Sequence, residues 1–282
     1  MFRRTLSLLV LAVFLLQAVA IAAPPKVLAP PLTVGPPPAI GAEAAVVMVA
    51  NTRRVLFGQN PNSIMYPAST TKMMTLLLAL ERGNLDSVVT VSSHAAACEE
   101  SSLGLRPGDQ ITLRELLFGM MIVSGNDAAE AVAEHIAGSV PAFVKLMNDR
   151  VDKLGLKNTH FSNPHGLPDP TNHYSTAYDL AQIAATGMQN PMFAKIVSTA
   201  DYTVRFINRG PMQVSTTNKL LRSYPGANGI KTGYTEAAGD CLVAGAKRQD
   251  IQLIAVVLND DDRWTDVPKL LDYGFQRSGF TQ

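Results

Sequence analysis

The sequence predicts an α+β fold in which an antiparallel sheet is flanked by helices. Three observations support this prediction. Apolar runs typical of strands occur near both ends of the chain, and a long block with helical periodicity lies between them. The last strand-like runs are separated by short polar turns, which favour antiparallel pairing. Strands from both ends can share one sheet, which the helices of the middle then cover.

The individual elements follow from periodicity and from signals at their ends. Apolar runs at 44–50 and 55–57 flank a polar turn, which predicts a hairpin. A helix is expected from Ser69 to Arg82, closed by Gly83. The other predicted elements are helices at 113–123, 127–137, 141–154, 176–188 and 191–198, strands at 228–235, 241–248 and 252–258, and an amphipathic helix at 263–274.

Residues 1–22 have the pattern of an export signal. Arg3 and Arg4 precede an apolar stretch that ends in small residues suited to cleavage. An uncleaved membrane anchor stays open, because the stretch approaches the roughly 20 residues that span a bilayer. Residues 23–40 are rich in proline and predict a semi-rigid linker, and residues 41–282 are assigned to one folded domain. We therefore expect an exported protein that works outside the cytoplasm.

Composition excludes several other classes of protein. With 47% hydrophobic residues and a formal net charge of +1, the chain is neither disordered nor a typical nucleic-acid binder. Cys98 and Cys241 lack the spacing of a zinc or redox motif and are expected to be small buried residues. His160, His165 and His173 are interpreted as structural, and we expect neither a metal nor a cofactor.

The first candidate motif is Ser69-Thr70-Thr71-Lys72, at the start of a predicted helix. A spacing of three puts Ser69 and Lys72 on one helical face, within roughly 5–6 Å at Cβ. An amine kept neutral by burial or by a neighbouring cation can take the proton of a serine hydroxyl. Free N–H groups at the helix start can stabilise an oxyanion. The alternative is a helix cap beside a solvated lysine.

The second candidate motif is Ser124-Gly125-Asn126, on a turn between two predicted helices. A hydroxyl and an amide two residues apart can project into one cleft. There Ser124 could relay a proton and Asn126 could bind a substrate amide. Taken alone, the simpler interpretation is an ordinary turn and helix cap.

The third candidate motif is Lys231-Thr232-Gly233, followed by Tyr234, in a predicted strand. Because Gly233 has no side chain, a peptide could lie against the strand and use its backbone N–H groups. Lys231 and Thr232 could bind a carboxylate, and the charge of Lys231 would disfavour protonation of Lys72. The alternative is a glycine bulge on an edge strand.

Together, the three motifs resemble those of the serine D-alanyl-D-alanine carboxypeptidases, the low-molecular-mass penicillin-binding proteins that trim peptidoglycan stem peptides. The motif types and their order are those of penicillin-binding proteins and β-lactamases. Gly125, where β-lactamases usually carry aspartate, favours the carboxypeptidases. The resemblance covers Glu43 to Phe275 and includes segments 67–75, 163–167, 175–180, 217–221 and 270–275.

The resemblance implies the β-lactamase/DD-peptidase transpeptidase-like fold and acyl transfer in two steps. Ser69 would attack the carbonyl between two terminal D-alanines while Lys72 takes its proton. The N–H groups of Ser69 and Tyr234 would form the oxyanion hole. Ser124 would relay a proton to the leaving D-alanine, and Asn126 would orient the acyl side chain. Water would then hydrolyse the acyl-enzyme.

Substrate recognition is also implied by the resemblance. Lys231 and Thr232 would hold the free carboxylate, with Gly233 allowing close approach. Arg263 either adds to that contact or is a solvated residue at a helix start. The expected partners are peptidoglycan stem peptides ending in D-Ala-D-Ala, with β-lactams as inhibitors. We expect no nucleic acid, and membrane contact only through an uncleaved N-terminal segment.

Four alternatives to a carboxypeptidase stay open. An endopeptidase, a transpeptidase or a β-lactamase would share the fold and the motifs, and the β-lactamase would have to deacylate penicillin rapidly. A non-catalytic cell-wall binding protein is the alternative from a different class.

Overall fold

The computed structural model describes residues 35–279. The predicted export signal at 1–22 and most of the predicted linker at 23–40 lie outside these residues. Among the residues described, no helix combines the length and the apolar character needed to cross a membrane.

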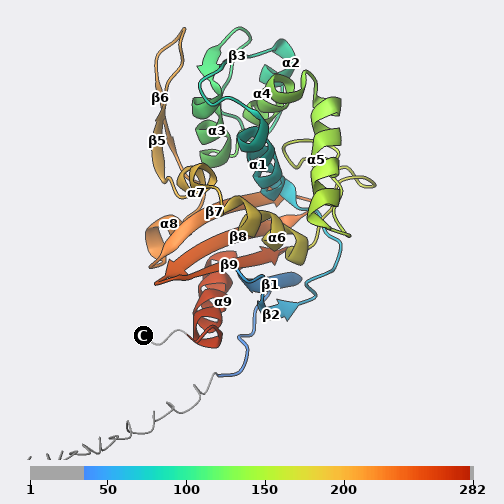
Figure 1. The fold of residues 1–282 in the computed structure, drawn as a ribbon, viewed down its shortest axis with the longest axis vertical. Helices are drawn as coiled ribbons and strands as arrows, with labels where there is room; N and C mark the ends of the chain where they lie inside the picture. Colours follow the sequence, from blue (N-terminus) through green and yellow to red (C-terminus); the bar gives the residue numbers. More distant parts are fainter. Residues whose placement is uncertain (1–34, 280–282) are drawn as a thin grey trace, which may run out of the picture. The chain divides into compact units, whose positions relative to one another are not determined.

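A five-stranded antiparallel sheet organises residues 35–279, with the strand order β2-β1-β9-β8-β7 (Figure 1). Its strands are β1 (Ala44–Val49), β2 (Val55–Gln59), β7 (Ala227–Thr235), β8 (Gly239–Arg248) and β9 (Ile251–Leu258). Strands from the two ends of the sequence do share one sheet, because β1 pairs with β9 along its whole length. This arrangement leaves β7 at one edge, where a peptide can approach its backbone.

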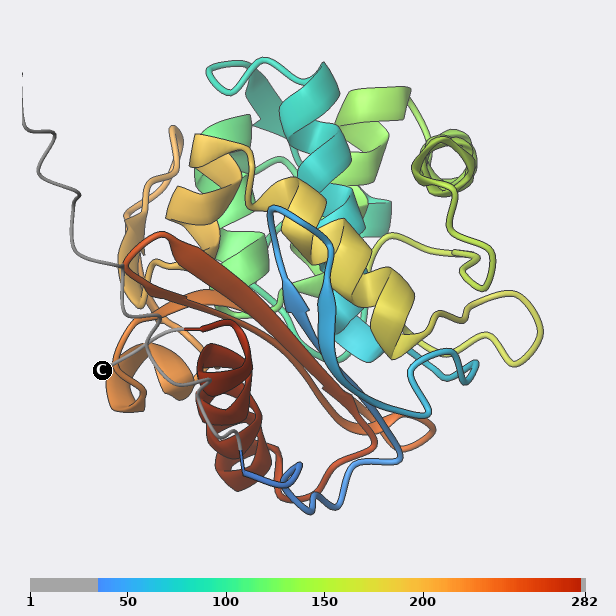
Figure 2. The ribbon, with the colours of Figure 1, turned by 60° about the horizontal axis from the view of Figure 1, so that its bottom comes forward.

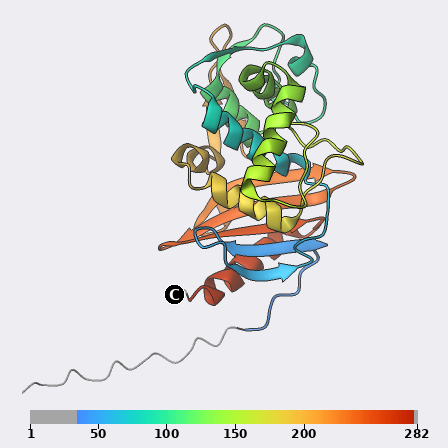
Figure 3. The ribbon, with the colours of Figure 1, turned by 45° about the vertical axis from the view of Figure 1, so that its right-hand side comes forward.

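Helices cover both faces of the sheet, as Figures 2 and 3 show. On one face α9 (Arg263–Arg277) packs against β8 and β9 and buries Val267, Leu270 and Leu271. On the other face α6 (Ala177–Gly187) lies against β1 and β9. The larger core is on this second face. The remaining long helices there are α1 (Lys72–Arg82), α3 (Leu113–Ile122), α4 (Asn126–Ala137), α5 (Val140–Leu154) and α7 (Pro191–Val197).

Local sequence signals explain where several of these helices begin. Thr112 and Thr176 accept hydrogen bonds from backbone N–H groups at the starts of α3 and α6. Asn190 does the same for α7, whose first residue, Pro191, has no N–H to leave unsatisfied. Such caps explain why the predicted helix boundaries agree with the observed ones to within three residues.

The helix predicted from Ser69 to Arg82 starts differently from the expectation. A 3₁₀ turn, η1 (Ala68–Thr71), comes first, and Lys72 is the first residue of α1. Two short strand pairs and two short helices were not predicted, because elements of three or four residues show no measurable periodicity. These are β3 (Val88–Thr90), β4 (Gln110–Thr112), β5 (Asp201–Val204), β6 (Met212–Ser215), α2 (Ser93–Ala96) and α8 (Leu220–Ser223).

Candidate active site

Three separate parts of the fold bring the predicted motifs together. Ser69 lies in η1, Ser124-Gly125-Asn126 connects α3 to α4, and Lys231-Thr232-Gly233 is part of β7. Lys72 Nζ lies 2.9 Å from Ser69 Oγ and 2.6 Å from Asn126 Oδ1. Lys231 Nζ lies 3.0 Å from Ser124 Oγ. Lys72 thus links Ser69 to the segment after α3, and Lys231 links that segment to the edge strand β7.

The hydrogen bonds of Lys72 fit a neutral amine acting as a base. Besides Ser69 Oγ, its Nζ contacts Asn126 Oδ1 and the carbonyl oxygen of His165, the latter at 2.8 Å. Both of these oxygens can only accept hydrogen bonds. A neutral amine has two N–H groups, which these two oxygens use. In this neutral form, the lone pair of Lys72 Nζ is left for the Ser69 hydroxyl.

The surroundings of Lys72 favour this neutral form. Its side chain is fully buried. Burial, followed by the positive charge of Lys231, holds the pKa of Lys72 well below its usual value of 10.5. Ser69 is partly exposed, so a substrate can reach its hydroxyl while Lys72 stays out of water.

Lys231 is also buried, and its pKa lies close to neutral pH. Its Nζ donates to Ser124 Oγ and, at 2.9 Å, to the carbonyl oxygen of Thr232. Burial and the charge of Arg263 lower the pKa of Lys231 to about 7. Lys231 is therefore partly protonated at neutral pH, and its ammonium form has a third N–H available for an anion.

The turn after α3 holds Ser124 in a strained conformation, and Asn126 follows as the first residue of α4. Ser124 has a φ of 65°, in the left-handed region that residues other than glycine rarely adopt. The Asn126 side-chain amide donates to the carbonyl oxygen of Glu99 at 2.9 Å, while its Oδ1 accepts from Lys72. Both ends of the Asn126 amide are thus engaged within the protein. This geometry makes Asn126 a partner of Lys72, in addition to its predicted contact with substrate.

The approach of η1 to β7 favours glycine at position 233. A Cβ atom on Gly233 would lie 3.0 Å from Ala68 Cβ and 3.2 Å from the backbone nitrogen of Ser69. With a larger residue, Ala68 or Ser69 would have to shift by a few tenths of an ångström. The neighbouring Thr232 hydroxyl contacts the Thr217 hydroxyl at 2.6 Å, so two hydroxyls lie together beside the strand.

Arg263 contacts the backbone of the sheet. Its Nη1 donates to the carbonyl oxygens of Gly233 and Cys241 at 2.7 and 3.0 Å, and its Nη2 pairs with Asp240. These bonds engage the guanidinium with β7 and β8, so Arg263 supports the strand that carries Lys231. Tyr234 follows Gly233 with a side chain that is 61% exposed.

Sequence reasoning missed the loop that contacts Lys72 through a backbone carbonyl. His165 Nδ1 accepts a hydrogen bond from the Leu167 N–H, and its Nε2 lies 3.0 Å from Glu130 Oε1. The following residue, Gly166, approaches the Ala68 carbonyl so closely that a Cβ atom would collide with it. The segment 163–167 was recognised as part of the resemblance, but a carbonyl contact leaves no signature in a sequence.

Cys98, Glu130 and His165 together form a group of potential metal ligands that the sequence did not suggest. Because His165 Nδ1 accepts from Leu167, the proton of the neutral ring is on Nε2, which faces Glu130. That nitrogen has no lone pair to offer a metal ion. The expectation that Cys98 is buried is wrong, since the residue is partly exposed. Partial burial of its thiol, followed by the nearby charge of Glu130, raises the pKa of that thiol to about 11.

Comparison with known proteins identifies the family. The sequence profile of the peptidase S11 family, described as D-alanyl-D-alanine carboxypeptidase, matches residues 32–262. The chain belongs to this family. Its fold is similar to the crystal structure of the Streptomyces K15 DD-transpeptidase, with a TM-score of 0.81 and 34% sequence identity over 86% of this chain and 99% of that one. The α+β fold predicted from the sequence is confirmed.

Two curated S11 relatives differ in how much of their length is matched. D-alanyl-D-alanine carboxypeptidase DacF of Bacillus subtilis is 41% identical over 244 residues, which cover 84% of this chain and 62% of DacF. DacB2 of Mycobacterium tuberculosis is 36% identical over 242 residues, covering 83% of this chain and 82% of DacB2. The chain therefore spans less than two thirds of DacF and most of DacB2.

Proposed function

We propose that this S11 peptidase is a serine D-alanyl-D-alanine carboxypeptidase that removes the terminal D-alanine from peptidoglycan stem peptides. The observation that supports this most strongly is the geometry of Lys72. A buried amine with a lowered pKa contacts two carbonyl oxygens and lies 2.9 Å from a partly exposed serine hydroxyl, a position from which its neutral form can take the serine proton. The names of the curated relatives agree with this activity.

In the proposed acylation step, Ser69 Oγ attacks the carbonyl carbon between the two D-alanines and passes its proton to Lys72 Nζ. The N–H groups of Ser69 and Tyr234 stabilise the oxyanion. The bond to the leaving nitrogen then breaks, and Ser124 relays the proton from Lys72 to the D-alanine amine. Asn126 keeps the amine of Lys72 oriented throughout.

The proposed recognition step uses the charge of Lys231. Its ammonium form, together with the hydroxyl of Thr232, binds the free carboxylate of the terminal D-alanine. Arg263 contributes indirectly by holding the Gly233 carbonyl and thus the strand.

In deacylation, a water molecule gives a proton to Lys72 and attacks the acyl carbon. Ser69 then takes the proton back as its bond to carbon breaks.

Mass spectrometry with penicillin and with a D-Ala-D-Ala peptide tests this function. The wild-type protein should gain the mass of penicillin at Ser69 and should release one D-alanine per peptide. Ser69→Ala should do neither while keeping its thermal unfolding midpoint. Ser124→Ala should still be labelled at Ser69, only more slowly. Labelling at another residue in Ser69→Ala would contradict the proposed nucleophile.

Transpeptidation is the second candidate, favoured by the similarity to a DD-transpeptidase structure. Both reactions pass through the same acyl-enzyme and differ in whether water or an amine accepts the acyl group. Product analysis in the presence of a free amino acid or peptide amine separates them. A dominant aminolysis product would favour the transpeptidase, and the free peptide shortened by one D-alanine would favour the carboxypeptidase. The lifetime of the penicilloyl-enzyme separates both from a β-lactamase.

We also propose that the protein is exported, on the basis of the residues at 1–22. Sequencing the N-terminus of the secreted protein should give a start near Ile21 or Ala23. Recovery of Met1 in the membrane fraction would mean that the segment is an uncleaved anchor.

A further inference from the structure

Glu130 is a buried acidic residue that none of the proposed steps uses. It lies on α4 four residues after Asn126, so both side chains are on the same helical face. Asn126 contacts Lys72 directly, whereas Glu130 Oε1 lies 3.0 Å from His165 Nε2. One face of α4 therefore contacts both Lys72 and the residue whose carbonyl oxygen accepts from Lys72.

The ring of His165 is held at both of its nitrogens. Its Nδ1 accepts from the Leu167 N–H at 3.1 Å, so the proton of the neutral ring is on Nε2. That Nε2–H faces the Glu130 carboxylate at a hydrogen-bond distance. The carbonyl oxygen of the same histidine lies 2.8 Å from Lys72 Nζ. A ring fixed in this way also fixes its own backbone, and with it the carbonyl oxygen that Lys72 uses.

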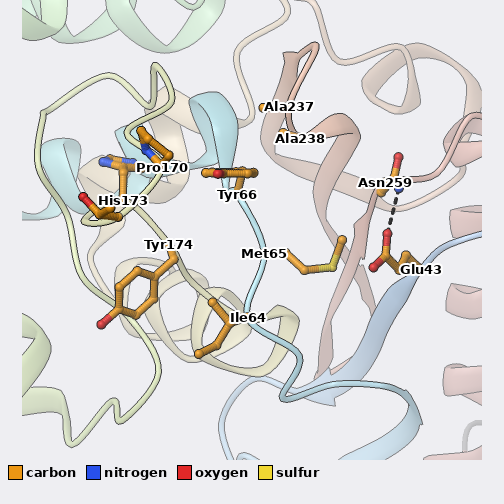
Figure 4. Close-up of a pocket in the computed structure, with 11 residues that line it drawn as sticks. Glu43, Ile64, Met65, Tyr66, Pro170, His173, Tyr174, Ala237, Ala238 and Asn259 are labelled. Atoms are coloured by element: carbon orange, nitrogen blue, oxygen red, sulfur yellow. Dashed lines mark hydrogen bonds between the residues drawn. The ribbon is translucent and has the colours of Figure 1, made fainter.

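A second buried histidine has the same kind of role in this fold. His173 lines the pocket drawn in Figure 4. Its Nδ1 accepts from the Ser162 N–H at 3.1 Å, and its Nε2 lies 2.8 Å from the Thr71 hydroxyl of η1. Each histidine thus joins a backbone N–H of one segment to a polar side chain of another. The partner of His173 is a neutral hydroxyl, whereas the partner of His165 is a carboxylate.

The turn at 163–167 is attached to two helices. Thr75 on α1 donates to the carbonyl oxygen of Pro164 at 2.6 Å, and Lys72, on the same helix, contacts that of His165. The ring of His165 reaches α4 instead, at Glu130. Because Lys72 is itself the side chain to be oriented, Glu130 supplies a point of attachment that does not belong to α1.

The burial of Glu130 distinguishes this contact from a surface ion pair. Glu130 is 5% exposed, and its Oε2 has no hydrogen-bond partner among the residues that the structure describes. The exposed His94 lies 3.3 Å from that oxygen. A buried carboxylate with one oxygen left unpaired adds little to the free energy of unfolding. Stability therefore does not account for Glu130, and its contact with His165 favours a role in the site.

We propose that Glu130 is a positioning residue that fixes the ring of His165 and so keeps the His165 carbonyl oxygen against Lys72. That oxygen and Asn126 take the two N–H groups of the neutral amine, which leaves its lone pair for Ser69. Without Glu130 the carbonyl oxygen is less well placed, and the amine rotates more freely. This inference rests on the proposed role of Lys72 as the base and adds a residue that acts on it through His165.

Stopped-flow acylation by penicillin tests the proposal on two variants. Glu130→Ala removes the acceptor of the Nε2–H, and we expect the acylation rate constant to fall about three- to tenfold, as for one lost hydrogen bond. Glu130→Gln keeps an acceptor without the charge and should stay within about twofold of the wild type. A Glu130→Gln rate as low as that of Glu130→Ala would contradict positioning through this hydrogen bond.

Substrate binding separates positioning from damage to the fold. In the Ser69→Ala background, Glu130→Ala should leave the Kd for a D-Ala-D-Ala peptide within about twofold, because the carboxylate contacts at Lys231 and Thr232 are unchanged. Glu134→Ala is the matched control. It removes a partly exposed carboxylate one turn further along α4 and should be acylated at the wild-type rate. A Kd that rises as much as the acylation rate falls would overturn the proposal.

A double-mutant cycle with His165 completes the test. His165→Ala keeps the carbonyl oxygen but removes the ring, so it should slow acylation as Glu130→Ala does. The double variant should be no slower than His165→Ala alone, because both changes break the same contact. Additive losses, or a Glu130→Ala rate equal to that of the wild type, would overturn the positioning role.

A proton NMR measurement keeps this test distinct from the proposed activity. The signal of the His165 Nε2–H should be protected from solvent exchange in the wild type and in Glu130→Gln, and lost in Glu130→Ala. If penicillin does not acylate the wild type while this signal behaves as expected, the proposed activity fails and the contact stands. A His165 signal that is unchanged in Glu130→Ala would refute the contact itself.

Discussion

The ionisation of Lys231 provides a direct test of carboxylate recognition. Burial and Arg263 lower the pKa of Lys231 to about 7, and kcat/KM reports ionisations of the free enzyme. At pH 6, a charge-assisted hydrogen bond of about 1.5–3 kcal/mol predicts a roughly ten- to hundredfold preference for a peptide acid over its C-terminal amide. At pH 9 about one Lys231 in a hundred is protonated, so we expect the preference to fall to about twofold or less.

The assay is the ratio of kcat/KM for the peptide acid to that for the amide, measured from pH 6 to pH 9. Ionisation of Lys72 affects both peptides equally and cancels in this ratio. Lys231→Ala should give a ratio near one at every pH, whereas Lys231→Arg should give a ratio that does not change with pH, because arginine stays charged. A wild-type ratio that is constant across this range would refute the assignment of the carboxylate to Lys231.

Two further changes have expected outcomes. Asn126→Ala removes an acceptor 2.6 Å from Lys72 Nζ, so the amine loses its orientation, and stopped-flow acylation by penicillin should slow by about tenfold or more. Asp260 is buried, and burial together with Asp266 raises its pKa to about 6. Its protonated form favours folding, so the free energy of unfolding should fall as pH rises from about 4 to about 6. Asp260→Asn should remove that fall and add about 1–3 kcal/mol at pH 7.5, as measured by urea unfolding.

Much of the sheet could be predicted from the sequence because its strands leave local signals. The apolar runs that became β7, β8 and β9 are separated by turns of three and two residues, which permit only antiparallel neighbours. That strands from both ends of the sequence share one sheet was also expected, but the direct pairing of β1 with β9 was not predicted. The 3₁₀ turn that precedes α1 was not expected. It begins at Ala68, whose φ of 47° is a backbone property that an alanine in the sequence does not indicate.

The candidate site also contains some residues that could be predicted from the sequence and some contacts that could not. Side chains in motifs, such as Ser69 and Lys72, were identified because their spacing is short and their chemistry is recognisable. The second acceptor of Lys72 is the carbonyl oxygen of His165, 93 residues away, which any residue type could supply. Likewise, Glu43 and Asn259 are 216 residues apart and meet only because β1 and β9 are neighbours. Long-range polar contacts of this kind depend on the completed fold.

The order of the causes that lower the pKa of Lys72 has a consequence for catalysis. In the proposed complex, the substrate carboxylate neutralises Lys231, which removes one of the two influences that lower the pKa of Lys72. If Lys231 were the main influence, binding of substrate would protonate the base that must attack it. Burial is the larger cause, and a bound peptide can only exclude more water from Lys72. Recognition of the carboxylate and deprotonation of Ser69 are therefore compatible because Lys72 is buried, and its charged neighbour makes a secondary contribution.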